Sequence, residues 1–238
     1  MSQRERPIVA IDGPAGAGKS TVTRVVAERL GYHLINTGAI YRTLALAAQR
    51  RGFGFHEDEN IGALAHELVA REAIRLVPAD GIEYRVLLEG EDVSSAIRTQ
   101  VLGEGASKVS AIPAVRDALL DLQRAAGRQG GVVLEGRDIG TVVFPDAEAK
   151  FFLTASVDVR AKRRHDELLA RSQPPSLEDV KREVIERDRR DSLRPIAPLR
   201  QAPDAVVVDS SELDIAQVAE RIVELVRAVE RRLARPAS

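Results

Sequence analysis

The sequence contains no cysteine and no tryptophan, and its 238 residues include only three tyrosines, five phenylalanines and one methionine. The lack of cysteine excludes disulfides, thiolate nucleophiles and zinc–thiolate sites, and it suits a reducing cytoplasm. The shortage of aromatic side chains argues against a stacking platform for single-stranded nucleic acid. No apolar run approaches the length of a membrane span, and the polar start of the chain lacks the pattern of a signal peptide.

Neither sign of charge dominates the composition. The 35 lysines and arginines nearly balance the 36 aspartates and glutamates, so a general attraction to nucleic acid or to acidic membranes is not expected. Any cationic site must therefore be local. We expect a cytoplasmic, monomeric protein without a nucleic-acid or membrane partner, built as one α/β domain over residues 1–238.

A glycine-rich segment near the N-terminus, which we call the glycine loop (residues 13–21), matches the phosphate-binding pattern G-x-x-x-x-G-K-[ST] at every fixed position. The apolar run before it predicts a strand, and the residues after it have helical spacing. In this arrangement backbone N–H groups and a helix N-terminus face phosphate oxygens. The alternative is a glycine-rich turn that matches by chance. The match predicts a nucleoside triphosphate site in which Lys19 reaches the β- and γ-phosphates, Ser20 holds Mg²⁺, and the loop supplies Gly13, Pro14, Ala15, Gly16, Ala17, Gly18 and Thr21.

Short apolar runs alternate with helical stretches along most of the chain. Runs of this length and near-continuous apolarity are typical of parallel strands that are covered on both faces. The alternation predicts a doubly wound α/β fold with five parallel strands flanked by helices. The strands are expected at residues 8–11, 32–35, 131–134, 149–153 and 205–208, and the helices at about 19–30, 39–51, 113–127, 157–170, 176–190 and 214–233.

One region, from about residue 60 to 105, departs from this alternation. Residues 73–77 and 82–89 have the character of short strands, and the Asp80-Gly81 pair between them is a strong hairpin signal. This predicts a small antiparallel sheet in an inserted lobe. Two loops flanked by arginines, residues 171–175 before the capping box Ser176-x-x-Asp179 and residues 195–203, are candidates for a mobile lid.

Charged residues follow two of the predicted strands, at the edge where open α/β sheets bind ligands. Thr37 and Arg42 follow the second strand, and the alternative is a helix N-cap with a surface arginine. Glu135-Gly136-Arg137-Asp138 follows the third, where the alternative is that Arg137 and Asp138 neutralise each other or nearby charges. Both groups are therefore candidates for ligand binding.

The densest group of charges is the stretch from residue 187 to 194. On a helix, Arg187, Asp191 and Arg194 would share one face, and Asp188 and Arg189 would be ordinary solvent-facing charges. Taken alone, this stretch reads best as a solvated salt-bridge face. Arg160 and Arg164 lie one turn apart at a helix start, a poor place for cations unless they bind an anion.

In this order the chain contains the strings IDGPAGAGKST, NTGAIYR, LEGEDVSSAIRT, EGRDIGTVVFPDA and ERDRRDSLRPIAPL. With them it resembles the bacterial cytidylate kinase family from about Pro7 to Leu233. The resemblance implies a P-loop kinase fold with a core (about 7–37, 106–156 and 196–238), a nucleoside-monophosphate-binding lobe (about 38–105) and a short lid (about 157–195). It also implies ATP and CMP or dCMP as substrates, Mg²⁺ as cofactor, and ADP with CDP or dCDP as products.

Residue by residue, the resemblance implies roles for the positions that match. It implies that Arg42, Arg137 and Arg194 contact the acceptor phosphate or the transferring phosphoryl group, and that Arg160 and Arg164 lie over the adenine and phosphates of ATP. The catalytic set would be Lys19, Arg137, Arg164 and Arg194. The cytosine would be surrounded by Thr37, Ser107, Arg116 and Asp138, and the ribose would face Arg187 and Asp191. Two positions depart from the pattern: Thr37 stands where many relatives have serine, and Ser192 where some have another basic residue.

Several converging arginines, a lysine and Mg²⁺ suit in-line phosphoryl transfer, which needs positioning and charge neutralisation more than a general base. A carboxylate such as Asp138 can accept a hydrogen bond from the exocyclic amine of cytosine, whereas uracil has a carbonyl there. We therefore expect CMP and dCMP to be preferred over UMP. The alternatives are another small-molecule P-loop kinase, such as a shikimate-type kinase, and a nucleotide-dependent switch protein.

Overall fold

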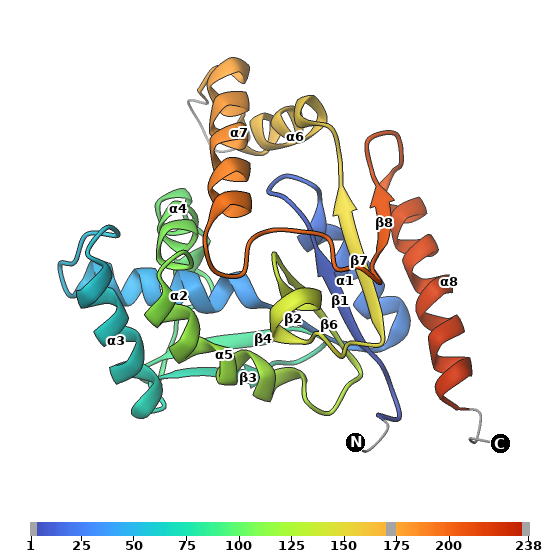
Figure 1. Cartoon of the computed structure of the whole chain (residues 1–238), viewed down its shortest axis with the longest axis horizontal. Helices are drawn as coiled ribbons and strands as arrows, with labels where there is room; N and C mark the ends of the chain where they lie inside the picture. The colour runs from blue at the N-terminus through green and yellow to red at the C-terminus, as the bar shows by residue number, and fades with distance from the viewer. Residues whose placement is uncertain (1–3, 170–174, 235–238) are drawn as a thin grey trace.

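The computed structural model describes residues 4–169 and 175–234, and its centre is a parallel five-stranded sheet (Figure 1). The strands lie in the order β2-β6-β1-β7-β8, and every neighbouring pair is parallel. This confirms the predicted sheet, with each strand within one or two residues of its expected place. The bounds are β1 (Ile8–Asp12), β2 (His33–Asn36), β6 (Val132–Gly136), β7 (Ala149–Thr154) and β8 (Val206–Asp209).

Apolar side chains cover both faces of this sheet. Along β1, Val9 and Ile11 pack with α1 (Lys19–Leu30) and α8 (Ile215–Leu233) on one face. Ile8 and Ala10 point to the other face, toward α5 (Pro113–Gly127) and a short π-helical turn, η2 (Ile139–Val143). All five residues of β1 are buried, which explains why its first four residues form a continuous apolar run rather than an alternating one.

The region between β2 and β6 forms a second packing unit beside the sheet. The hairpin of β3 (Ile74–Pro78) and β4 (Tyr84–Leu88) confirms the predicted antiparallel lobe, and the two-residue strand β5 adds a third strand that was not predicted. β3 and β4 share one apolar core with the helices α2, α3, α4 and α5 and with the 3₁₀ turn η1. The bounds are β5 (Glu91–Asp92), η1 (Ala96–Arg98), α2 (Thr37–Arg50), α3 (Asp58–Ala70) and α4 (Gln100–Val109).

The hairpin also contacts the main sheet. The N–H of Leu34 on the edge strand β2 donates to the carbonyl of Ile82 at 2.7 Å, so the hairpin turn adds a hydrogen bond to the exposed edge of the sheet. The helix α4 was not predicted, and the expected boundary between lobe and core at residues 105 and 106 falls inside it.

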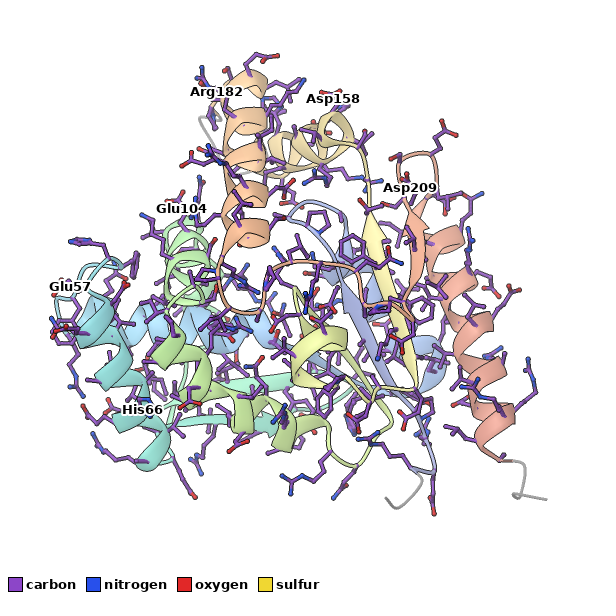
Figure 2. The ribbon with its side chains drawn as sticks, in the orientation of Figure 1. Glu57, His66, Glu104, Asp158, Arg182 and Asp209 are labelled. Carbon is purple, nitrogen blue, oxygen red and sulfur yellow. The ribbon has the colours of Figure 1, made fainter. Side chains whose placement is uncertain are left out.

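Two helices, α6 (Val157–Leu169) and α7 (Leu177–Leu193), stand above the carboxyl end of the sheet (Figure 1). They pack on each other through Leu168, Val180 and Val184, while the labelled Asp158 and Arg182 point outward (Figure 2). Ser176 caps α7 by accepting from the N–H of Asp179, as predicted. Residues 171–174 of the predicted lid loop lie outside the described residues.

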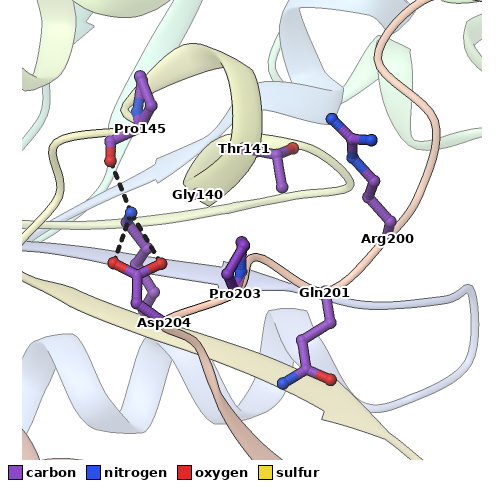
Figure 3. A pocket seen from close by; sticks show the side chains of 8 residues that line it. Gly140, Thr141, Pro145, Arg200, Gln201, Pro203 and Asp204 are labelled. Carbon is purple, nitrogen blue, oxygen red and sulfur yellow. Dashed lines mark hydrogen bonds and ion pairs between the residues drawn. The ribbon is translucent and has the colours of Figure 1, made fainter.

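The predicted loop at residues 195–203 leads from α7 back to β8. Just after the loop, Asp204 is bound by Lys150. The ammonium group of Lys150 on β7 donates to the carbonyl of Pro145 at 2.6 Å and to the carboxylate of Asp204 at 2.8 Å (Figure 3). No helix in the described parts of the chain is both long and apolar enough to cross a membrane.

We expect the change Gly13→Ala to lower the free energy of unfolding by more than about 3 kcal/mol, as severe overpacking does. A Cβ at Gly13 would lie 1.9 Å from the carbonyl oxygen of Leu153 on β7, so β1 and β7 would have to separate. Urea denaturation followed by circular dichroism measures the effect.

The matched control is Gly31→Ala at the end of α1. Gly31 has a left-handed φ of 61°, but a Cβ there would meet no described atom within 4 Å, so only the backbone penalty of about 1 kcal/mol applies. Equal losses in the two variants would contradict the clash at Gly13.

Candidate active site

The carboxyl ends of three strands meet at one edge of the sheet and bring the predicted site segments together. Asp12 on β1 lies opposite Gly136 on β6, and Asn36 on β2 lies opposite Glu135. The glycine loop, the start of α2 and the turn after β6 are therefore neighbours, as the position of their residues after parallel strands predicted.

Thr37 helps to hold this edge together. Its hydroxyl, on a side chain that is 3% exposed, donates to the carbonyl of Glu135 at 2.8 Å. The N-cap of α2 is Asn36, which accepts from the N–H of Ala39, so the alternative that Thr37 is the cap is wrong. Thr37 instead connects β2 to the end of β6.

Lys19 lies over the glycine loop. Its ammonium group donates to the carbonyls of Gly13 and Pro14, both at 2.7 Å. Burial lowers the pKa of Lys19, and the nearby positive charge of Arg137 lowers it further, against the opposing charge of Glu135. A buried ammonium group beside other cations is poised to bind an anion.

Ser20 and Glu135 face each other beside this lysine. The Ser20 hydroxyl lies 3.0 Å from both carboxylate oxygens of Glu135, which is 4% exposed. Burial raises the pKa of Glu135, and the charge of Lys19 opposes that rise. Glu135 was predicted only as part of a candidate ligand-binding group. Its contact with Ser20 depends on the parallel register of β1 and β6.

Arg137 and Arg187 lie near Lys19, and Arg42 and Arg164 lie near these two arginines. We call the five residues the cation cluster (Lys19, Arg42, Arg137, Arg164 and Arg187). Burial lowers the pKa of Arg187 to about 10, and the charges of Arg137, Arg42 and Arg164 act in the same direction. Burial also lowers the pKa of Arg42, with further contributions from Arg137 and Arg164. Positive groups from α2, the turn after β6, α6 and α7 therefore lie close to one another.

One donor within the cation cluster is unsatisfied. The Nε of Arg187 is buried and has no hydrogen-bond partner among the described residues. A buried donor without a partner costs roughly 1–3 kcal/mol. An anion bound within the cluster would supply a partner and would also relieve the repulsion among the arginines.

A second group of polar residues, nearly all buried, adjoins the cation cluster. Asp138 pairs with Arg116 and also accepts from Arg194 at 3.3 Å. Asp191 accepts from the Ser107 hydroxyl at 3.3 Å and from Arg137 at 2.9 Å. The four elements α4, α5, the β6 turn and α7 therefore contribute to one polar site. Arg137 and Asp138 do not pair with each other. Each pairs with other nearby charges, as the second form of the alternative predicted.

The end of α7 differs from the sequence prediction. The helix ends at Leu193, and Arg194 has an extended backbone with ψ of 139°, so Arg187, Asp191 and Arg194 do not share one helical face. Asp191 is only 3% exposed and Arg194 only 7%. The interpretation of this stretch as a solvated salt-bridge face is therefore wrong, although Arg189 is exposed as expected.

The two arginines of α6 have different environments. Arg160 is 4% exposed, and its guanidinium donates to the carbonyls of Ala155 at 2.9 Å and of Ala15 in the glycine loop at 3.1 Å. Arg164 is half-buried, pairs with Glu167 at 3.1 Å and adds its charge to the cation cluster.

With this geometry established, comparison with known proteins identifies the family. The sequence profile of a family described as cytidylate kinase matches residues 9–228. The chain belongs to the cytidylate kinase family. It is 52% identical over 220 residues to a cytidylate kinase of Citrifermentans bemidjiense, and this covers 92% of each chain. It is 49% identical to a cytidylate kinase of Pseudomonas aeruginosa, over 91% of this chain and 93% of the relative.

Comparison with solved structures supports the fold but says nothing about the function. An uncharacterized protein from Eubacterium ventriosum aligns with a TM-score of 0.50 at 12% identity, over 94% of this chain and 99% of its own. The overall arrangement of sheet and helices in the cytidylate kinase family is therefore also found in proteins of low sequence similarity.

Asp12 is a site residue that the sequence analysis missed. Its buried carboxylate accepts the N–H groups of Ile139 and Gly140, both at 2.8 Å. An anion at the start of η2 stabilises its free N–H groups. Asp12 thereby fixes the turn that carries Arg137 and Asp138. The only trace of this role in the sequence was an acidic residue that ends an otherwise apolar strand.

A separate cavity of about 530 Å³ lies behind the same turn (Figure 3). It is lined by Thr141, Lys150, Arg200 and Asp204 among others, and its lining includes no member of the cation cluster. Lys150 and Asp204, which both line it, pair with each other. The cavity is thus distinct from the candidate active site of this family member.

The pH dependence of stability tests the environment of Asp12. Burial raises the pKa of Asp12 from 3.8 to about 6. Because the folded-state pKa lies above that of the unfolded chain, this residue favours folding at low pH, and the contribution is lost as the pH rises through 6. Between pH 7 and pH 5 we expect wild type to gain about 1 kcal/mol of stability over the Asp12→Asn variant.

Urea denaturation at the two pH values measures this difference. The control is Asp117→Asn on α5, whose side chain is exposed, and its stability difference from wild type should not change with pH. A pH-independent difference for Asp12→Asn would contradict the raised pKa.

Proposed function

We propose that the protein transfers the γ-phosphoryl group of ATP to CMP or dCMP, giving ADP and CDP or dCDP in a Mg²⁺-dependent reaction. The cation cluster carries this proposal, because its member Arg137 lies near Lys19 of the glycine loop and near Asp138, and binds Asp191. The cytidylate kinases to which the chain is similar support the choice of acceptor.

The chemistry follows from the charges of the site. In phosphoryl transfer, negative charge is spread over the oxygens of the moving group while the attacking and leaving oxygens are in line. In our proposal the glycine loop binds the phosphates of ATP through its N–H groups, and Lys19 leaves the carbonyls of Gly13 and Pro14 to bind them too. Arg137, Arg164 and Arg194 then stabilise the transferring group, since guanidinium groups match phosphate oxygens.

Magnesium fits beside the glycine loop. The hydroxyl of Ser20 and the carboxylate of Glu135 are hard oxygen donors that already face each other at 3.0 Å, and such donors suit Mg²⁺ together with substrate phosphates and water. We propose that these two residues would together hold the ion, Ser20 directly and Glu135 through water. When bound, the ion neutralises charge on the phosphates.

The acceptor nucleotide occupies the polar site in this proposal. Asp138 accepts from the exocyclic amine of cytosine, and Arg116 donates to the acceptor atoms of the base, with Thr37 and Ser107 beside them. Arg42 binds the acceptor phosphate, and Arg187 and Asp191 face the ribose. The position of Arg187 in the cation cluster also suits a contact with phosphate.

We propose that three parts of a single domain have different roles. Residues 38–105 bind the nucleoside monophosphate, residues 157–195 act as the lid, and the rest forms the core that binds ATP. The paired helices α6 and α7 support the lid, because they pack on an apolar cluster of their own. The apolar cluster of the small sheet also includes α5, so the lobe that binds the nucleoside monophosphate packs directly on the core. We further propose a cytoplasmic monomer that has neither a nucleic-acid nor a membrane partner, consistent with the balanced charge.

The direct test is ADP formation from ATP with each of CMP, dCMP, UMP, AMP, GMP and shikimate. We expect fast turnover with CMP and dCMP, slow turnover with the others, and loss of activity with EDTA. The Lys19→Ala variant should lose at least about a thousandfold in kcat, in line with the loss of a phosphate-neutralising group.

The alternatives give different results in the same assay. Turnover with shikimate would indicate another small-molecule P-loop kinase. Slow ATP hydrolysis that no acceptor stimulates, with ATP still bound, would indicate a nucleotide-dependent switch protein and would contradict the kinase proposal.

A second test addresses base selection by Asp138. In Asp138→Asn the charge that accepts from the cytosine amine is lost, so we expect kcat/KM for CMP to fall about a hundredfold and that for UMP to change less. The ratio of CMP to UMP efficiency should therefore fall. Steady-state kinetics with both acceptors measure it, and the exposed Asp117→Asn serves as the control.

Equal use of CMP and UMP by wild type would contradict the role of Asp138. Since Asp138 also pairs with Arg116 and Arg194, the melting temperature of each variant is recorded so that a loss of folding is not taken for a loss of specificity.

A further inference from the structure

The outward-facing carbonyls of the glycine loop are bound by side chains from outside the loop. Arg160 of α6 donates to Ala15 at 3.1 Å, and the hydroxyl of Ser210, after β8, lies 3.3 Å from the carbonyl of Ala17. Arg163 of α6 in turn donates to Ser210 at 3.0 Å. In a loop whose N–H groups face phosphates, carbonyls that point away must be satisfied elsewhere. These contacts do so and fix the direction of the N–H groups.

Arg160 also packs closely on the loop. A Cβ placed at Gly16 would lie 3.0 Å from the carbonyl oxygen and 3.1 Å from the Cβ of Arg160. The φ of Gly16 is 77°, in the left-handed region that glycine adopts without strain. The first turn of α6 and the middle of the glycine loop therefore touch through their backbones, and a shift of Arg160 would move the loop.

Asp188 is the counter-ion that keeps Arg160 in this place. Its Oδ2 lies 2.7 Å from Nη1 of Arg160, and this is the one ion pair of Arg160 within the described ranges. The Arg160 side chain is 5% exposed and that of Asp188 22%. A buried guanidinium without a carboxylate partner is unfavourable, because its lost hydration is not replaced. Asp188 was interpreted from the sequence as a solvent-facing charge, and that interpretation is wrong.

The same helix carries residues of the acceptor side. Arg187 precedes Asp188, and Asp191 follows it by three positions, within one turn of α7. Arg187 belongs to the cation cluster, and Asp191 binds Ser107 and Arg137. The contact between Asp188 and Arg160 therefore links the glycine loop to the helix that holds these groups.

We propose that Asp188 is a positioning residue for the ATP site: by pairing with Arg160 it holds the carbonyl of Ala15 outward, so that the glycine loop presents its N–H groups to phosphate. The inference rests on the proposed function, in which this loop binds ATP. Asp188 contacts no substrate in this account and acts through Arg160 and the loop backbone.

The test is a comparison of Asp188→Asn with wild type in two assays. Loss of the ion pair that holds Arg160 against the loop should raise KM for ATP about tenfold and leave KM for CMP within about twofold. Without CMP, calorimetry should give about tenfold weaker binding of ADP and of inorganic tripolyphosphate, which has phosphates but no nucleoside. A loss confined to ADP would overturn the proposal, because it would mean that Arg160 reads the adenine instead.

Arg160→Lys tests the same contact from its other end. A lysine keeps the positive charge but cannot make the contacts of Nε and Nη1 together, so the same ATP-selective loss is expected. If Asp188 acts through Arg160, the double variant should be no weaker than the weaker single variant. Effects that multiply, or an equal rise in KM for CMP, would overturn the proposal. Thermal denaturation shows whether Asp188→Asn is folded. If it is not, the Arg160→Lys variant is used to test the proposal.

The matched control is Glu186→Gln, which removes a carboxylate from an exposed position on the same helix. It should match wild type in both assays, and an Asp188→Asn variant no different from it would overturn the proposal. Failure of this proposal can be distinguished from failure of the proposed function. If wild type phosphorylates no nucleoside monophosphate, the kinase proposal fails, whereas tripolyphosphate binding to the loop still reports on the positioning pair.

Discussion

The repulsion among positive charges at the carboxyl edge of the sheet is the constraint to which the rest of the site responds. Lys19, Arg42 and Arg187 are buried or half-buried, and the charge of Arg137 lies close enough to each of them to lower its pKa. Such a group of cations is unfavourable by itself, because burial removes hydration while the charges still repel. The stability of the packed apolar core must offset the unfavourable free energy of these buried cations. A bound polyanion removes the repulsion among them.

Carboxylates within the site limit the repulsion without filling the region where phosphates would bind. Asp138 lies between Arg116 and Arg194, and Asp191 holds Arg137. A buried ion pair adds little net stability compared with an apolar contact, but removing one partner is costly. These pairs therefore fix the directions of the arginines more than they stabilise the fold. Asp12 plays a similar part with backbone N–H groups in place of a cation.

The fold was largely predictable, because its features depend on local patterns. The continuous apolar run at Ile8–Ile11 and the helical spacing after the glycine loop predicted β1 and α1. The same reasoning missed α4, in which two glycines, Gly103 and Gly105, weaken the helical pattern. A Cβ at Gly105 would lie 2.7 Å from the ring of Phe55, so this glycine serves a tertiary contact. The two-residue strand β5 is too short for any periodicity to reveal.

The motifs of the site could be recognised from the sequence. Which side chains contact one another within the site could not. Nothing local distinguishes Asp188 from Arg189, yet Asp188 pairs with Arg160 and Arg189 is exposed, because α6 packs on only one side of α7. Likewise, Ser20 and Glu135 are far apart along the chain and meet only through the pairing of β1 with β6. The sequence by itself determined the fold class, the glycine loop and the family, since these depend on residue types at short spacings. Only the tertiary structure decided which charges pair, which stay unpaired and which carbonyls hold the loop, because these depend on distances between elements that are remote in sequence.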